Sequence, residues 1–337
     1  MWRDKINFLS KLTPKRVSNA LGLVSSFAMS RWNKSAQAKY LPVALAVEPT
    51  TSCNLRCPEC PSGLRSFTRP TGMLRKDMFE KLMDEIGDTL MYLTFYFQGE
   101  PYLHKDFLGM VEKATKKGIY TSTSTNAHYL HYDNALATVK SGLDRLIISI
   151  DGTTQDVYTQ YRVGGNLNKV LEGTKNIIRA KKELNSRTPH VIFQFLVVKP
   201  NEHQMAEVKA LAKDLGVDEL RFKTAQIYDY ENGSELIPEN DRFSRYQRVG
   251  EGKWAIKNKL IDHCWKMWHS AVVTWDGIVV PCCFDKDAEY RMGNVSEKSF
   301  NEVWFSSTYT KFRAQLIKGR KHIEMCKNCT EGTKIWG

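Results

Sequence analysis

The stretch EPTTSCNLRCPECP (48–61) follows an apolar run and places three cysteines on one short segment. Cys53, Cys57 and Cys60 have the spacing C-x3-C-x2-C. Three thiolates on one loop can bind one face of a 4Fe–4S cluster and leave its fourth iron open to another ligand. A zinc knuckle or a C-x2-C redox pair are the alternatives, but structural zinc needs four ligands and no further Cys or His occurs before His104. We therefore expect an iron–sulfur cluster here.

Downstream of residue 43, short apolar runs alternate with segments of helical periodicity. The runs cover 43–48, 92–97, 119–125, 145–150, 190–198 and 219–227. Several are apolar at nearly every position, as in strands that are covered on both faces. Between the first two runs, Phe79, Leu82 and Ile86 recur at helical spacing. This alternation predicts right-handed parallel βαβ units in an α/β fold, either a partial barrel or a doubly wound sheet.

The alternation stops near Tyr228. Residues 229–261 are polar and aperiodic, which is typical of a linker or bridging segment. Residues 262–337 are Cys-rich with little apolar periodicity, and so small a segment is expected to need a metal to hold its shape. Four of its cysteines could bind either an iron–sulfur cluster or zinc, and spacing alone barely separates the two. They are Cys264, Cys282, Cys326 and Cys329.

The first cysteine group and the ends of the following strands resemble the radical S-adenosylmethionine superfamily. In that family the open iron is chelated by the amine and carboxylate of S-adenosylmethionine, and reductive cleavage yields a 5′-deoxyadenosyl radical that abstracts a hydrogen atom. The resemblance implies an enzyme with a partial (β/α)6 parallel barrel at 43–228. It also implies a 4Fe–4S cluster, S-adenosylmethionine and an external electron donor such as a flavodoxin or ferredoxin.

Residues at the predicted strand ends extend this resemblance. The segment Gln98-Gly99-Glu100-Pro101 matches the family's Gly-Gly-Glu motif, which implies that Glu100 holds the methionyl amine, and Gln98 replaces the first Gly. The residues expected to contact the cofactor are Gln98, Gly99, Glu100, Thr125, Asn126, Ser149, Asp151 and Arg162. Each alone could cap a turn or lie in solvent. All except Arg162 follow strands at the edge where parallel sheets bind ligands. Glu59 departs from the pattern, since the family often has an aromatic residue there.

The C-terminal cysteines resemble the SPASM or twitch domain that follows many barrels of this family. Its full form has seven cysteines and two auxiliary clusters, and the intermediate Cys-rich stretch is missing here. The resemblance therefore implies one auxiliary 4Fe–4S cluster on the four cysteines named above. Cys283 is left over, either as a hydrogen-atom donor like the cysteine of radical epimerases or as a spare thiol. In related sulfatase-maturing enzymes the residue at the position of Cys283 is a catalytic Asp base, and Asp285 and Asp287 nearby are the alternative bases in this chain.

Positive charge is concentrated in an N-terminal arm (1–42). The net charge is +12, and residues 1–40 carry eight Lys or Arg and one acid, hence +7, which leaves +5 for the rest. Val17, Leu21, Val24 and Ala28 fall on one helical face of this basic arm, joined by Ala20, Leu23 and Phe27. Such a helix suits an anionic membrane surface. The alternative is a helix that packs on the barrel while its charges remain solvated.

Nothing at the N-terminus is typical of a cleavable signal peptide, and the apolar part of the arm is too short to span a bilayer. We therefore predict a cytoplasmic protein, with peripheral contact at the inner membrane face left open. The substrate could be a peptide, a saccharide or a lipid-linked molecule. Nucleic acid is disfavoured because the barrel is only mildly basic.

Three functions agree with these features. The first is hydrogen abstraction followed by an oxidative modification, with the auxiliary cluster as acceptor of the second electron. The second is maturation or epimerisation of a peptide or protein, with Cys283 as hydrogen donor. The third, from a different class, is a non-catalytic iron–sulfur or zinc-binding protein.

Overall fold

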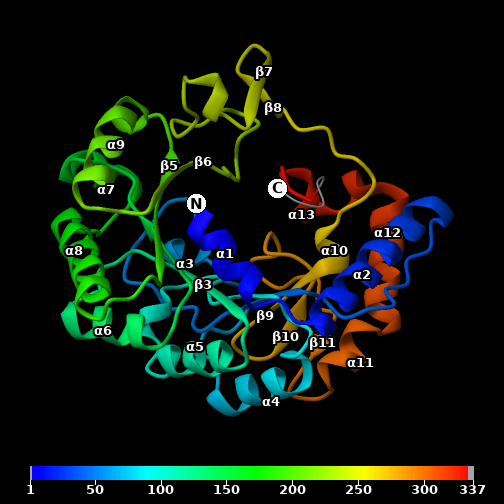
Figure 1. The fold of residues 1–337 in the computed structure, drawn as a ribbon. Coiled ribbons are helices and arrows are strands. Elements are labelled where there is room, and N and C mark those ends of the chain that lie inside the picture. The colour runs from blue at the N-terminus through cyan, green and yellow to red at the C-terminus, as the bar shows by residue number, and fades with distance from the viewer. Residues whose placement is uncertain (1, 333–337) are drawn as a thin grey trace.

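Six parallel strands form the centre of the molecule (Figure 1), in a computed structural model that describes residues 2–332. Each strand pairs in parallel with the next along the chain. They are β1 (Ala44–Val47), β2 (Tyr92–Thr94), β3 (Tyr120–Thr125), β4 (Arg145–Ser149), β5 (His190–Val197) and β6 (Glu219–Thr224). All six lie within the predicted apolar runs. Within the described residues β1 and β6 do not pair, so the sheet curves as an open barrel. The predicted α/β fold is confirmed.

Helices cover the outer face of this sheet (Figure 1). They are α4 (Lys76–Ile86), α5 (Phe107–Lys116), α6 (Tyr132–Lys140), α7 (Gln155–Tyr161), α8 (Leu167–Glu183) and α9 (Met205–Asp214). In α4, Phe79, Leu82 and Ile86 are buried against the sheet, as their spacing predicts. Burial of each such side chain contributes about 2 kcal/mol to folding. The helices therefore leave only the strand ends open to ligands.

The C-terminal segment extends the same sheet. Strand β9 (Ser270–Val273) pairs in parallel with β1, and the antiparallel strands β10 (Ile278–Val280) and β11 (Gly293–Asn294) follow. The helices of this segment are α10 (Lys266–His269), α11 (Phe300–Trp304), α12 (Ser307–Gly319) and α13 (Glu324–Lys327). Trp268, Trp304 and Tyr309 are fully buried in the core that the barrel helices share. Aromatic residues without regular spacing therefore pack this segment against the barrel, which its lack of apolar periodicity did not reveal.

The bridging segment contains a β-hairpin that the sequence did not predict. Its strands β7 (Tyr246–Gly250) and β8 (Lys253–Ile256) pair antiparallel around Gly252, which has a φ of +67°. Glycine adopts this conformation without strain, so the chain can reverse there. The strands are short, and most of β7 is exposed. Neither strand therefore has the alternating apolar pattern by which strands are recognised.

The N-terminal arm packs against the end of the barrel where the strands begin. Helix α1 (Trp2–Ser10) lies across β3 and β4 (Figure 1), and its buried Asp4 accepts a hydrogen bond from the Tyr120 hydroxyl and pairs with Arg145. Helix α2 (Pro14–Asn33) buries Arg16, which is 2% exposed. The Arg16 guanidinium donates to the carbonyls of four residues, Lys11, Gly87, Lys117 and Gly118. The arm is therefore joined to the barrel by polar contacts.

Only part of the apolar face predicted for the arm is buried. Leu23 and Phe27 lie in the core, where Phe27 contacts the rings of Trp265 and Trp268. Leu21 is 67% exposed. Helical periodicity was correct, but the sequence could not show which side meets the barrel. Packing on the barrel is confirmed, whereas full solvation of the charges is wrong for Arg16. No helix among residues 2–332 is long and apolar enough to cross a membrane.

Candidate active site

The three N-terminal cysteines lie on the loop that joins β1 to the short helix α3 (Pro61–Leu64). The loop is tight at Gly63, where an added Cβ would lie 2.6 Å from the backbone nitrogen and oxygen of Cys57. Burial raises the pKa of the Cys53 thiol to about 11, and it raises the pKa of Cys57 as well. Thiols of this kind become good ligands only when a metal displaces their protons. The loop therefore suits a metal cluster better than a reactive cysteine pair.

A buried ion pair holds the ends of the cysteine loop together. Glu48 ends the run that contains β1, and Arg69 lies beyond α3. The Arg69 guanidinium donates to both carboxylate oxygens of Glu48, at 2.9 and 2.6 Å, and both side chains are buried. Glu48 also accepts a hydrogen bond from the backbone nitrogen of Trp275. The C-terminal segment thus helps to fix the loop.

Glu100 lies where the segments after β2 and β3 meet. Its side chain is 2% exposed and accepts hydrogen bonds from the Thr125 hydroxyl at 2.7 Å and from the Asn126 backbone nitrogen at 2.8 Å. Burial raises the pKa of Glu100 to about 7. Gly99 beside it has a φ of +75°, and an added Cβ would lie 2.2 Å from the Thr50 carbonyl oxygen. Only glycine fits where this segment crosses the cysteine loop.

Most of the predicted cofactor residues surround one pocket. Its volume is about 120 Å³, and its predicted lining residues are Cys53, Cys57, Cys60, Gly99, Glu100, Thr125, Asn126, Ser149 and Arg162. Gln98 lies just outside, with its amide oxygen 3.8 Å from the Cys60 sulfur. Tyr96 and Phe97 also line the pocket. The sequence analysis missed both because they belong to an apolar run and resemble buried strand residues.

Asp151 lies behind this pocket and orients Arg162. One Asp151 carboxylate oxygen pairs with the Arg162 guanidinium, and the other accepts the Leu196 backbone nitrogen at 2.7 Å. Asp151 is fully buried, and both of its oxygens already have partners. Arg162 reaches toward the cysteines, with Nη1 3.7 Å from the Cys57 sulfur. This geometry favours Arg162 over Asp151 as the residue that contacts a ligand.

Glu59 connects the cysteine loop to the chain beyond β6. Its carboxylate accepts the Tyr228 backbone nitrogen at 2.9 Å. The ammonium of Lys286 lies 4.7 Å from the Tyr228 ring. Tyr228, whose backbone nitrogen bonds to the Glu59 carboxylate, therefore places an aromatic side chain near Cys60.

The four predicted auxiliary ligands are all buried, whereas Cys283 is exposed. Burial raises the pKa of Cys326 to about 11, and it also raises the pKa of Cys264 and Cys329. The buried guanidinium of Arg320 lies among these three thiols and donates to the Cys329 sulfur at 2.8 Å. Four thiolates around an iron–sulfur cluster carry net negative charge, so a buried cation there fits such a group.

The two candidate catalytic residues of this segment differ in their surroundings. Cys283 lies 3.8 Å from the Lys266 ammonium and is open to solvent. Asp285 is 3% exposed, and its carboxylate accepts the backbone nitrogens of Glu289 and Tyr290, both at 2.9 Å. The carboxylate of Asp285 thus holds its own loop, which favours Cys283 as the reactive group.

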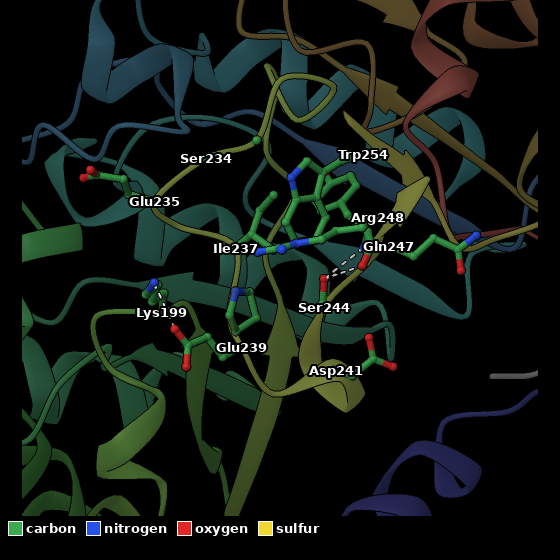
Figure 2. A pocket seen from close by; sticks show the side chains of 13 residues that line it. Lys199, Ser234, Glu235, Ile237, Glu239, Asp241, Ser244, Gln247, Arg248 and Trp254 are labelled. Atoms are coloured by element: carbon green, nitrogen blue, oxygen red, sulfur yellow. Dashed lines mark hydrogen bonds and ion pairs between the residues drawn. The ribbon is translucent and has the colours of Figure 1, made fainter. Parts of the chain in front are cut away.

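A larger pocket lies away from these residues. It has a volume of about 810 Å³ and lies beside the hairpin of β7 and β8 (Figure 2). Trp254 and Arg248 contribute to its wall, and so does the ion pair of Lys199 and Glu239, 3.0 Å apart. None of the predicted ligands line this pocket, so size alone does not identify the active site.

Comparison with known protein families agrees with this geometry. The model of the radical SAM superfamily matches residues 47–218, just over half of the chain. The chain belongs to the radical S-adenosylmethionine superfamily. A second model, described as an iron–sulfur cluster-binding domain of the SPASM type, matches residues 264–330. As a radical S-adenosylmethionine enzyme, the chain uses a 4Fe–4S cluster and S-adenosylmethionine, and its SPASM domain implies auxiliary iron–sulfur binding.

Similar proteins act on different molecules. The tungsten-containing aldehyde ferredoxin oxidoreductase cofactor-modifying protein of Pyrococcus furiosus is 27% identical over 315 residues, covering 85% of this chain and 86% of the relative. The PqqA peptide cyclase of Gluconobacter oxydans is 23% identical over 316 residues, covering 88% and 85%. The structure of Streptococcus suis SuiB bound to precursor peptide SuiA has a TM-score of 0.62 and 13% identity, covering 91% and 74%. This structural likeness concerns the fold.

Proposed function

We propose that this radical S-adenosylmethionine enzyme abstracts a hydrogen atom from a peptide or protein and modifies it oxidatively. The convergence of the cysteine loop and Glu100 on one pocket carries the proposal. When bound, the cluster and S-adenosylmethionine supply a 5′-deoxyadenosyl radical. The substrate would give up one hydrogen atom to this radical. The auxiliary cluster would accept the second electron while a proton is lost, which completes a two-electron oxidation.

Different residues of the pocket would bind the cluster and S-adenosylmethionine. Cys53, Cys57 and Cys60 would hold the cluster and leave one iron open. Glu100 would accept a hydrogen bond from the methionyl amine, and Arg162 would pair with the methionyl carboxylate, for which its position beside Cys57 is suitable. Exclusion of water by the buried walls protects the radical. An external flavodoxin or ferredoxin would supply the first electron.

A peptide substrate has the strongest support among the substrate classes. A relative that covers most of this chain is a PqqA peptide cyclase, and SuiB, of similar fold, binds a precursor peptide. In this chain the exposed Cys283 lies on the segment after β10, as does Lys286, which approaches Tyr228 beside the cysteine loop. A substrate placed there would contact both the barrel and the C-terminal segment.

The test is anaerobic reconstitution followed by iron and sulfide analysis. Dithionite and S-adenosylmethionine are then added, and 5′-deoxyadenosine is measured. We expect about eight irons per chain and cleavage that Cys53→Ala abolishes. The matched control Cys283→Ala should retain both. Candidate peptides encoded beside the enzyme are then added and their masses measured. If the enzyme cleaves S-adenosylmethionine but changes the mass of none of these peptides, the proposal of a peptide substrate is refuted. Full iron loading without cleavage would favour the non-catalytic alternative.

We also propose that the arm contacts the anionic cytoplasmic face of a membrane. Large apolar side chains project from the outer sides of α1 and α2, and Trp32 is 92% exposed. This apolar stripe consists of Trp2, Ile6, Leu9, Val17, Leu21 and Trp32. Exposed basic residues accompany it, whereas the only acid of the arm, Asp4, is buried and paired. An apolar surface with positive charge suits anionic lipid.

Point variants test this contact, because deletion of the arm would remove Leu23 and Phe27 from the core. Sedimentation with vesicles of phosphatidylcholine and phosphatidylserine should pull down the full chain. Leu21→Glu with Trp32→Glu should abolish the binding, whereas Val249→Glu on the exposed hairpin should not. Equal binding by all variants would refute the contact. A dimer that these two substitutions dissociate would identify a second copy as the occupant instead.

A further inference from the structure

Arg320 is a buried cation for which the protein provides no acidic partner. The residue follows α12 and is 1% exposed. Its Nη2 donates to the Cys329 sulfur and to the Glu331 carbonyl, both at 2.8 Å. Two other nitrogens, Nε and Nη1, are buried and have no hydrogen-bond partner. Within residues 2–332 no carboxylate forms an ion pair with this guanidinium. Burial of a cation in this state opposes folding strongly.

The neighbours of Arg320 show where its missing partner belongs. The titratable groups that act electrostatically on its guanidinium are three thiols, those of Cys264, Cys326 and Cys329. The backbone nitrogen of Arg320 is held by Asp262 at 2.9 Å, which fixes the start of this side chain close to Cys264 in sequence. Guanidinium keeps its proton in a protein, so a buried one is stabilised by carbonyl acceptors or by an anion, and two nitrogens of Arg320 have neither in the protein. Thiolates with an iron–sulfur core are the anion that this set of residues can assemble.

We propose that Arg320 donates hydrogen bonds to the auxiliary 4Fe–4S cluster and raises its reduction potential. The inference rests on the auxiliary cluster of the proposed function. A cluster with four thiolates gains one negative charge on reduction, and a fixed cation in a dry site stabilises the more negative state. Hydrogen bonds to sulfur act in the same direction. Arg320 is thus a positioning and tuning residue that makes the cluster a better acceptor for the electron from the substrate.

A redox titration of the auxiliary cluster alone tests this role. The background is the full chain with Cys53→Ala, Cys57→Ala and Cys60→Ala, reconstituted without oxygen and followed by electron paramagnetic resonance. Arg320→Gln should shift the midpoint to a more negative potential, and Arg320→Lys should shift it less because the charge remains. The matched control is Arg313→Gln. Arg313 is also buried in this segment, but it bonds to the Met267 and Trp304 carbonyls and not to a thiol.

Equal midpoints for the parent and Arg320→Gln would overturn the proposal, as would an equal shift for Arg313→Gln. If the glutamine variant loses its iron, the unsubstituted protein decides the question. Arginine labelled with ¹⁵N should give a nitrogen coupling to the reduced cluster in pulsed resonance spectra, and absence of this coupling would overturn the contact. If the triple variant binds zinc in place of iron, the redox role of Arg320 is overturned. Cleavage of S-adenosylmethionine by the parent enzyme would be unaffected by that result. These results separate this inference from the proposed function.

Discussion

Glu100 links S-adenosylmethionine binding to pH. Its buried carboxyl has a pKa of about 7 when the pocket is empty, so the free enzyme holds a proton there below neutral pH. The carboxylate form is needed to accept a hydrogen bond from the methionyl amine while it keeps its bonds to Thr125 and Asn126. Binding therefore displaces the proton, and affinity should fall as pH decreases.

The magnitude follows from the ionised fraction. A carboxyl with a pKa of about 7 is about 90% ionised at pH 8 and about 10% at pH 6, so its share of the change in affinity is about tenfold. Glu100→Gln removes the charge and keeps the shape. A hydrogen bond to a charged group contributes about 1.5–3 kcal/mol, so this variant should bind about 10- to 150-fold more weakly at pH 8.

The assay is equilibrium dialysis of S-adenosylmethionine with the oxidised, cluster-loaded enzyme at pH 6 and pH 8. Titration of the cofactor itself affects both proteins equally, so the difference between the parent and Glu100→Gln isolates the carboxyl. The control is Glu219→Gln. Glu219 has a pKa lowered to about 2, chiefly by hydrogen bonds from Arg221 and His190 that outweigh its partial burial, and it stays ionised at both pH values. Identical pH dependence in the parent and Glu100→Gln would refute the reasoning.

Three further predictions concern other parts of the chain. Glu48→Gln should destabilise the protein by about 3–5 kcal/mol, because it leaves the Arg69 cation buried without its partner. Calorimetry under identical iron loading should show a lower Tm, and an unchanged Tm would contradict this prediction. Arg16→Ala should lower the free energy of unfolding by about 2–4 kcal/mol, because the carbonyls that Arg16 joins lose their donor. Lys15→Ala, at an exposed ion pair, should change the Tm little. Equal effects of the two substitutions would contradict the anchoring role of Arg16. Cys283→Ser should keep all auxiliary iron after reconstitution, because the four predicted ligands are unchanged, and loss of iron would show instead that this thiol is a ligand.

The sequence was sufficient to predict the strands, and most of the residues expected to contact the cofactor lie around one pocket. Buried parallel strands need apolar residues on both faces, so their positions are visible as continuous runs, and the motifs follow the ends of those runs. Glu100 could be assigned to the pocket for this reason. Asp151 could not be separated from Arg162, because a sequence does not show that both oxygens of Asp151 already have partners.

Contacts between distant segments were beyond the sequence analysis. Nothing in residues 14–33 indicates that Arg16 finds four carbonyl acceptors, since three of those carbonyls belong to turns 71 to 102 residues away. The same is true of Arg320, whose basic neighbourhood resembles an ordinary solvated helix end. Both residues became informative only when their burial was known. Long polar side chains thus carry structural information that periodicity does not detect.

The pairing of β1 with β9 has a consequence for synthesis of the chain. Ala44 is the partner of Ser270, so β1 cannot pair with β9 until more than two hundred further residues have been synthesised. Pairing of such distant segments is slow, and an unpaired strand edge favours association between chains. The start of the cysteine loop also depends on late residues, since the Glu48 backbone nitrogen donates to the Val273 carbonyl. The loop therefore cannot reach this arrangement until β9 has been synthesised.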